Sequence, residues 1–261
     1  MLVDQHGGRP HQPVLRTEEL TWRVGEVSIV DRVSLDLRAG EFVAVIGPNG
    51  AGKTSLFNLI SGLRAASAGR VLLADEDITS LPPYRRARLG LGRTFQSSSV
   101  FGSLTVEENV RLAVQAHLGG SMRIWRRRAV DATVADRARY ILDQVFLGTR
   151  ATALAGTLAH GEKRKLEIAL LLAGEPRVLL LDEPMAGVSA EDVPALVEVI
   201  RGLGGGDAAR SVLMVEHHMD VVLDLADRVA VMHHGALLIC DTPDVVMADA
   251  VVQEAYLGEG L

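Results

Sequence analysis

Apolar and polar positions alternate in two stretches near the start of the chain, at 14–24 and at 28–38. Alternation with a period of two residues is typical of β-strands with one buried face. The apolar run EFVAVI follows at 41–46 and predicts a central strand that is buried on both faces. The first part of the chain therefore predicts a partly antiparallel sheet that leads into a buried strand.

A glycine-rich segment, GPNGAG at 47–52, separates this apolar run from a helical pattern at 53–60 that stops near Gly62. The order of strand, glycine loop and helix is the one that a phosphate-binding loop requires, because the loop presents its N–H groups at the start of the helix.

The middle third of the chain changes to helical spacing. Thr105 and Glu108 form a capping box ahead of NVRLAV, and ADRARYILDQVF repeats apolar residues at helical intervals. We therefore predict a mostly helical subdomain over residues 97–159.

A further amphipathic helix is predicted to begin within TLAHGEKRKLEIA, at 157–169. Its apolar face carries Leu166, Ala169, Leu170 and Ala173, and its outer face carries Lys163, Arg164 and Lys165. Helix N-termini attract anions, and Gly161 in the first turn would admit a ligand close to the main chain. This helix start is therefore a candidate anion site.

The last third alternates between strand and helix patterns. RVLLL at 177–181 and SVLMV at 211–215 predict strands, and Ser189 with Asp192 predicts the start of the helix between them. Two more strands are expected around a turn at 233–235, and Thr242–Pro243 predicts a last helix that runs toward Tyr256. Alternating units of this kind predict an α/β fold with a parallel sheet.

Composition narrows the class of protein. With 261 residues and 48% hydrophobic residues, the chain can bury a full core. A formal net charge of −6 argues against broad nucleic-acid affinity, and no apolar run reaches the roughly 18 residues of a membrane span. Cys240 is the single cysteine, so no intrachain disulfide is possible. Residues 1–13 are rich in Gly, Pro and His, and we expect them to form a loose tail.

The segment GPNGAGKTS has the spacing G-x-x-x-x-G-K-[ST] of a phosphate-binding P-loop. Lys53 is expected to reach the β- and γ-phosphates, and the Thr54 hydroxyl is expected to bind Mg²⁺. A dinucleotide loop is excluded, because Asn49 stands where that motif needs glycine. The residues expected to surround the nucleotide are Gly47, Pro48, Asn49, Gly50, Ala51, Gly52, Lys53, Thr54 and Ser55.

Two adjacent acids, Asp182 and Glu183, follow the predicted strand RVLLL. Ligands of open α/β sheets bind at the carboxyl ends of the strands. Asp182 is the candidate Mg²⁺ ligand, and Glu183 is the candidate general base for an attacking water. The plainer alternative is an acidic loop after a core strand.

With these motifs in order, residues 14–258 resemble the ATP-binding subunits of ABC transporters. LAHGE at 158–162 stands at the family's signature motif, RTFQ ends in a Q-loop glutamine, and VEHH holds a switch histidine. The segments RTFQSSSVFGSLTVEENV and VEHHMDVVLDLADRVAVMHHG are most similar to the ATPases of branched-chain amino-acid importers and of related urea and amide systems.

The resemblance implies a P-loop NTPase of the ABC ATPase fold, with a RecA-like core and an antiparallel β subdomain. The core and β subdomain would cover 14–96 and 160–261, and the helical subdomain at 97–159 would contact membrane subunits.

The same resemblance implies roles for single residues. Gln96 would contact Mg²⁺ and the attacking water, and His217 would bind the γ-phosphate, with His218 as the rival for that role. The signature segment would close over the ATP held by a second ATP-binding subunit. It comprises Leu158, Ala159, His160, Gly161 and Glu162.

Three positions depart from the family pattern. Ala159 replaces the signature serine, so its hydroxyl is missing. The aromatic residue that stacks on adenine falls at Val24, although Trp22 lies two residues earlier on the same strand face. Ser189 stands where the D-loop usually ends in aspartate or asparagine, and it is also a candidate helix N-cap.

The resemblance also implies the cofactors ATP and Mg²⁺ and a peripheral location on the cytoplasmic face of the membrane. The implied partners are two membrane-spanning permease subunits, a second ATP-binding subunit and, indirectly, an extracytoplasmic solute-binding protein, with no nucleic acid. Val100, Phe101 and Leu104 either receive a short helix of a membrane partner or fill the subdomain's own core. The basic segment RIWRRR at 123–128 is either a lipid- or partner-binding cluster or a solvated helix face.

Two other classes of function compete with an importer ATPase. An ABC-type ATPase with a soluble role in DNA repair or translation usually has coiled-coil insertions or two ATPase domains in one chain. A small-molecule P-loop kinase would need neither the signature segment nor His217.

Overall fold

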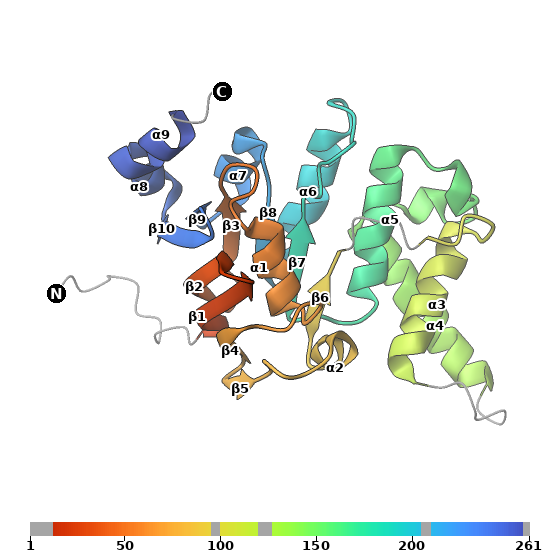
Figure 1. Cartoon of the computed structure of the whole chain (residues 1–261). Helices are drawn as coiled ribbons and strands as arrows, with labels where there is room; N and C mark the ends of the chain where they lie inside the picture. Colours follow the sequence, from red (N-terminus) through yellow and green to blue (C-terminus); the bar gives the residue numbers. More distant parts are fainter. Residues whose placement is uncertain (1–12, 95–99, 120–126, 205–209, 258–261) are drawn as a thin grey trace, which may run out of the picture.

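Two β-sheets and nine α-helices make up the described part of the chain, which is residues 13–94, 100–119, 127–204 and 210–257 of a computed structural model (Figure 1). The smaller sheet has the strand order β2-β1-β4-β5 and is antiparallel. Its strands are β1 (Pro13–Val24), β2 (Val27–Arg38), β4 (Ala68–Leu73) and β5 (Glu76–Asp77). The two alternating stretches thus form β1 and β2, as predicted.

The larger sheet has the order β10-β9-β3-β8-β7-β6, and only the β10–β9 pair is antiparallel. Its strands are β3 (Phe42–Ile46), β6 (Leu91–Arg93), β7 (Val178–Asp182), β8 (Ser211–Val215), β9 (Arg228–His233) and β10 (Ala236–Asp241). The apolar runs became central strands because both faces of this sheet are covered. In β7, for example, Val178 and Leu180 pack into one apolar cluster, and Leu179 and Leu181 pack into another.

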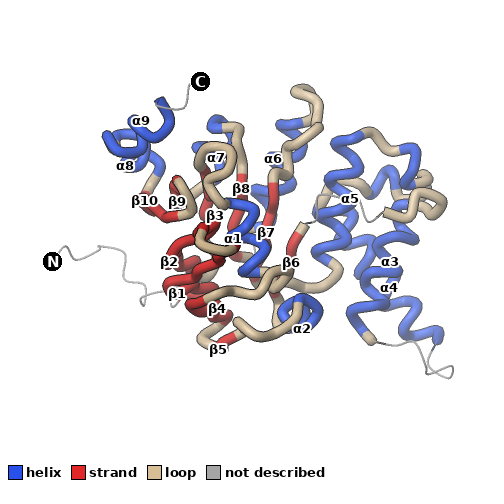
Figure 2. The backbone as a smooth tube through the Cα atoms, in the orientation of Figure 1, coloured by secondary structure: helices blue, strands red, loops and turns tan. Residues whose placement is uncertain are grey.

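Helices pack against the larger sheet, and a further group of helices lies to one side of it, as Figure 2 shows. The first helices are α1 (Lys53–Ile60), α2 (Pro83–Arg88), α3 (Val106–Leu118), α4 (Arg127–Gln144) and α5 (His160–Leu172). The others are α6 (Val193–Leu203), α7 (Met219–Leu225), α8 (Pro243–Ala248) and α9 (Ala250–Leu257). Short 3₁₀ turns occupy Gly148–Arg150 and Ala155–Thr157. Within the described ranges, none of the helices is long and apolar enough to cross a bilayer.

The capping box predicted for the middle third is present at the start of α3. Thr105 Oγ1 accepts a hydrogen bond from the Glu108 N–H at 3.1 Å, and the Thr105 N–H donates to Glu108 Oε2 at 2.8 Å. Helix α5 contacts α3, α4 and α6, and its buried side chains share one apolar cluster with all three. The helical region and the larger sheet are therefore joined through α5.

Two expectations about helix ends were wrong. Helix α6 begins at Val193 with Asp192 at its N-cap, and Ser189 instead donates its hydroxyl to Asp192 Oδ2 at 2.9 Å. The last helix is also interrupted. Asp249 is extended, and its carboxylate accepts hydrogen bonds from the N–H groups of Val251 and Val252, which ends α8 and starts α9.

Candidate nucleotide-binding site

The glycine loop between β3 and α1 is held against the turn that joins β9 to β10. A Cβ on Gly47 would lie 2.1 Å from the Met232 carbonyl oxygen, and a Cβ on Gly52 would lie 2.6 Å from the Ile29 carbonyl oxygen. The backbone of Gly47 has φ 148° and that of Gly52 has φ 95°, a region that favours glycine. Both glycines are thus required by close backbone packing, and Asn49 and Gly50 form the exposed rim of the loop.

Lys53 is the first residue of α1 and is almost fully buried. Its ammonium donates hydrogen bonds to the carbonyl oxygens of Gly47 at 2.6 Å and Pro48 at 2.8 Å. Burial lowers the pKa of Lys53, and the charges of Glu183 and Asp182 oppose that change. The loop, the lysine and both carboxylates therefore lie close enough to interact electrostatically.

Asp182 ends β7 and is buried. Its Oδ2 accepts a hydrogen bond from Arg93 Nη2 at 2.9 Å, whereas its Oδ1 is buried and has no hydrogen-bond partner among the described residues. Burial raises the pKa of this carboxyl, and the Arg93 guanidinium opposes the rise. A buried carboxylate oxygen without a partner is chemically suited to a hard cation.

The residues present fit Mg²⁺ bound together with a nucleotide rather than a metal site made by protein ligands alone. In the described part of the chain, no group of three or more His, Cys, Asp or Glu side chains could hold a metal ion. Mg²⁺ typically uses one or two carboxylates and completes its shell with phosphates and waters.

Glu183 and His217 lie side by side at the ends of β7 and β8. The distance between Glu183 Oε1 and His217 Nε2 is 3.0 Å, and both side chains are partly exposed. Glu183 has the unusual φ of 49°, and its N–H donates to the Val215 carbonyl at 2.9 Å. His218 turns instead toward Glu216, so His217 is the histidine that contacts the candidate base.

Glu216 is a buried residue of the site that sequence reasoning missed. Its Oε1 accepts from the Met185 N–H at 2.9 Å, and its Oε2 accepts from the His217 N–H at 2.7 Å and the His218 N–H at 3.2 Å. Glu216 thus ties the loop after β7 to the loop after β8. The available signal was an acidic residue directly after the buried run SVLMV.

The start of α5 differs from what the sequence suggested. Gly161 is buried, and a Cβ there would lie 2.8 Å from Cβ of Asp192, so the glycine is explained by packing within the chain rather than by access for a ligand. Ala159 and His160 are exposed, Leu158 is buried, and Glu162 Oε2 accepts from the Ala159 N–H at 3.1 Å. In Figure 1 this helix start and the loop before α1 lie at the same end of the molecule but well apart.

The structure does not join every predicted residue to the site. Gln96 and most of the cluster RIWRRR lie outside the described residues, and so do residues 1–12 of the predicted tail. Trp22 is half-buried, and the Arg64 guanidinium lies 5.6 Å from its ring centroid, whereas Val24 is 55% exposed. Trp22 therefore has a packing role within the chain, and the choice between these residues for adenine stays a prediction.

Comparisons with known proteins agree with this geometry. A family model described as ABC transporter matches residues 30–186. The chain belongs to the ABC transporter family. It is 36% identical to the high-affinity branched-chain amino acid transport ATP-binding protein LivG of Escherichia coli, over 95% of this chain and 99% of that protein. It is also 36% identical to BraF of Pseudomonas aeruginosa, which has the same descriptive name and is covered to 99%.

Solved structures of ABC transporter cassettes share the fold. The ADP conformation of MJ1267, an ATP-binding cassette of an ABC transporter, superposes with a TM-score of 0.81 at 29% identity, covering 95% of this chain and 99% of that one. A nucleotide-free cassette from an ABC transporter also has a TM-score of 0.81, at 28% identity. The predicted ABC ATPase fold is confirmed, and the chain is an ATP-hydrolysing subunit of this family.

Proposed function

We propose that this ABC ATPase drives an importer of branched-chain amino acids or of related small polar solutes. The similarity to LivG and BraF supports this proposal because it extends over 95% of the chain and almost the whole of each relative. The soluble roles in DNA repair and translation have no comparable support among the relatives reported above.

The contact between Glu183 and His217 carries the proposed reaction. Glu183 would accept a proton from the attacking water, and His217 would donate a hydrogen bond to the γ-phosphate. Lys53 would exchange its carbonyl partners for phosphate oxygens. Gln96, which lies outside the described residues, would contact the same water.

Mg²⁺ would neutralise part of the charge that develops on the phosphates. Asp182 would hold the ion or its waters through Oδ1, and Thr54 would contribute its hydroxyl at the start of α1. Gln96 is the third residue that we propose near the metal.

A second ATP-binding subunit would complete the site. Residues 158–162 would close over the partner's nucleotide, because this chain's own signature segment lies apart from its own glycine loop. Ala159 and His160 are exposed and are the first contacts that we expect there. Since Ala159 has no hydroxyl, it contributes no side-chain hydrogen bond to a phosphate.

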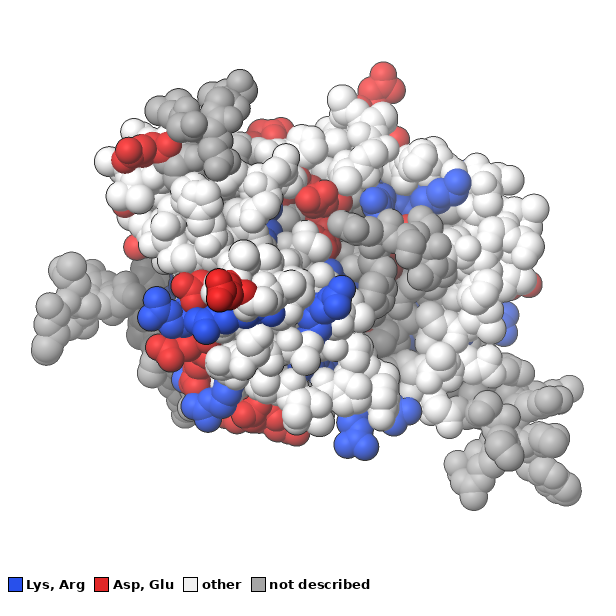
Figure 3. All heavy atoms as spheres, in the orientation of Figure 1, with Lys and Arg blue, Asp and Glu red and all other residues white. Residues whose placement is uncertain are grey.

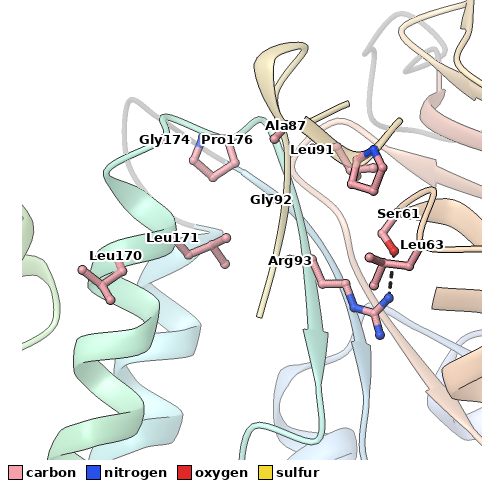
Figure 4. A pocket seen from close by; sticks show the side chains of 11 residues that line it. Ser61, Leu63, Ala87, Leu91, Gly92, Arg93, Leu170, Leu171, Gly174 and Pro176 are labelled. Atoms are coloured by element: carbon pink, nitrogen blue, oxygen red, sulfur yellow. Dashed lines mark hydrogen bonds between the residues drawn. The ribbon is translucent and has the colours of Figure 1, made fainter. Parts of the chain in front are cut away.

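The membrane partner would dock beside β6 and near Phe101. A largely apolar hollow of about 250 Å³ lies between α2, β6 and the end of α5, and it is lined in part by Leu63, Leu91, Leu171 and Pro176 (Figure 4). Nearby in sequence, Phe101 is 60% exposed. The alternative that Phe101 fills the core of the helical region is therefore wrong, and we propose that both features receive permease subunits.

The assembly would sit peripherally on the cytoplasmic face of the membrane, with two permease subunits and an external solute-binding protein. To test the function, uptake of labelled leucine, urea and a short amide is measured in cells that lack this gene. Re-expression should restore uptake of one solute class, and Glu183→Gln should bind ATP but restore none. If the chain is recovered without membrane subunits and re-expression leaves uptake of every solute unchanged, a soluble role in DNA repair or translation would be favoured.

A further inference from the structure

Arg93 is a buried arginine that joins three elements around the metal carboxylate. It ends β6, and its side chain is 9% exposed. Besides Asp182, its guanidinium donates to Asn58 Oδ1 at 2.9 Å and to Ser61 Oγ at 2.8 Å. Figure 4 shows the guanidinium of Arg93 directed toward Ser61, at the end of α1.

These contacts connect the carboxylate to the helix that carries the phosphate-binding residues. Lys53 and Thr54 open α1, whereas Asn58 lies within it and Ser61 caps its other end. Arg93 therefore fixes the distance between β7, which ends in Asp182, and α1. A planar guanidinium with several donors suits this role, because its hydrogen bonds have fixed relative directions.

Only one of the two carboxylate oxygens of Asp182 accepts a side-chain hydrogen bond in the described structure. Arginine often binds a carboxylate through both oxygens, but here Arg93 reaches only Oδ2. The other oxygen is buried without a partner in the described structure, and the same holds for Arg93 Nε. A buried polar atom without a partner is destabilising, so a residue that served only stability would be expected to satisfy both oxygens.

We propose that Arg93 is a positioning residue for metal binding, which occupies Oδ2 of Asp182 and ties that carboxylate to α1 so that Oδ1 is kept for Mg²⁺. The inference rests on the proposed role of Asp182. Arg93 itself does not contact the reacting atoms in this arrangement.

The test compares ATP affinity by calorimetry in excess Mg²⁺ and in EDTA, using the full chain and its variants. Arg93→Met should lower the ratio of the two affinities by about tenfold, and its affinity in EDTA should stay within about twofold of wild type. Arg93→Lys should fall between, because an ammonium cannot reproduce the three directed hydrogen bonds.

Arg86→Lys is the matched control. Arg86 is a second buried arginine next to α1, and it donates to the carbonyl oxygens of Leu59 and Ile60 without contacting Asp182. This variant should lower Tm and keep the wild-type ratio. If Arg93→Met does not fold, Arg93→Lys decides the question, and a wild-type ratio in that variant would overturn the proposal.

Asp182→Asn distinguishes the proposed role of Asp182 as a metal ligand from the proposed role of Arg93 as a positioning residue. If it keeps the full effect of Mg²⁺, Asp182 is not the metal ligand and the proposed function of that residue fails. If it loses the effect while folded Arg93→Met keeps it, only the role of Arg93 fails. A parallel fall of Arg93→Met in Mg²⁺ and in EDTA would show a general structural role and would also overturn the proposal.

Discussion

The buried ammonium of Lys53 is held in place by neighbouring groups of the chain. Its ammonium rests on the carbonyl oxygens of Gly47 and Pro48, and the carboxylates of Glu183 and Asp182 support its charged state. Because two carbonyl oxygens of the loop already accept from the ammonium, the phosphate oxygens of the proposed nucleotide would need only to replace them. The loop thus holds the lysine where we propose that the phosphates bind.

Lys53→Ala should weaken ATP binding by about tenfold to a hundredfold, since a hydrogen bond to a charged group contributes about 1.5–3 kcal/mol. Calorimetry with Mg²⁺ and ATP measures the effect. Lys163→Ala, on the outer part of α5, is the control and should bind normally. Equal affinities for the two variants would contradict the assignment of this loop.

Glu216 is expected to affect ATP hydrolysis indirectly, because it accepts hydrogen bonds from the N–H groups of Met185, His217 and His218. Glu216→Gln replaces one acceptor oxygen by an N–H₂ group that faces the N–H groups of Met185, or of His217 and His218. We expect kcat for ATP hydrolysis to fall about tenfold or more while ATP affinity changes little, because the loops after β7 and β8 lose their common anchor.

A double-mutant cycle distinguishes positioning from general destabilisation. If Glu216 acts mainly through His217, then Glu216→Gln should cost much less activity in a His217→Ala background than in the wild type. Equal losses in both backgrounds would instead show that Glu216 acts independently of the histidine.

At the scale of elements, the start of α5 lacks a side-chain cap. Ala159 occupies the N-cap position and has no side-chain acceptor. Among the described residues, Glu162 supports this end of the helix, because it accepts from the Ala159 N–H and pairs with Arg150 at 3.0 Å. A polar residue at 159 would add a cap, independent of any contact with a partner's nucleotide.

Ala159→Ser and Ala159→Asp should both stabilise the isolated chain, by about 1 kcal/mol, because either side chain caps α5. In the assembled transporter their effects should diverge. Serine can donate to a partner's γ-phosphate and should raise the rate of ATP hydrolysis, whereas aspartate repels the phosphate and should lower it. Urea unfolding and ATPase assays measure the two effects, and parallel changes in ATPase rate would argue against a phosphate at this position.

At the scale of the whole molecule, three apolar clusters hold the layers together. One joins α3, α4, α5 and α6 to one face of the larger sheet, and a second joins the smaller sheet and α1 to the other face. A third packs α7, α8 and α9 against β3 and β9. The helical region therefore packs in the same apolar cluster as β7, the strand that ends in Asp182.

Phe101→Asp should leave the isolated subunit folded, with Tm close to wild type, because the side chain is 60% exposed. It should, however, abolish co-purification with membrane subunits by placing a charge in the proposed docking surface. Phe146→Asp is the matched control, since Phe146 is 63% exposed just beyond α4. Normal co-purification of Phe101→Asp would place the membrane contact elsewhere.

The sequence by itself determined the features that depend on neighbouring residues. The glycine loop and Lys53 are contiguous, the capping box of α3 spans Thr105 to Glu108, and the period of apolar positions distinguishes β1 and β2 from α3. The pair of acids at the end of β7, Asp182 and Glu183, could be predicted for the same reason, because both directly follow a buried apolar run in the sequence.

Only the tertiary structure decided the contacts between distant residues and the ends of some helices. Arg93 meets Asp182 across 89 residues, and Glu216 meets Met185 across 31. Asp192 occupies the N-cap position of α6, whereas Ser189 donates its hydroxyl to the Asp192 carboxylate. Gly161 is small because Asp192 packs against it. Spacing along the chain determines which groups are available locally, but which buried charges become partners depends on how the strands are ordered in the sheet.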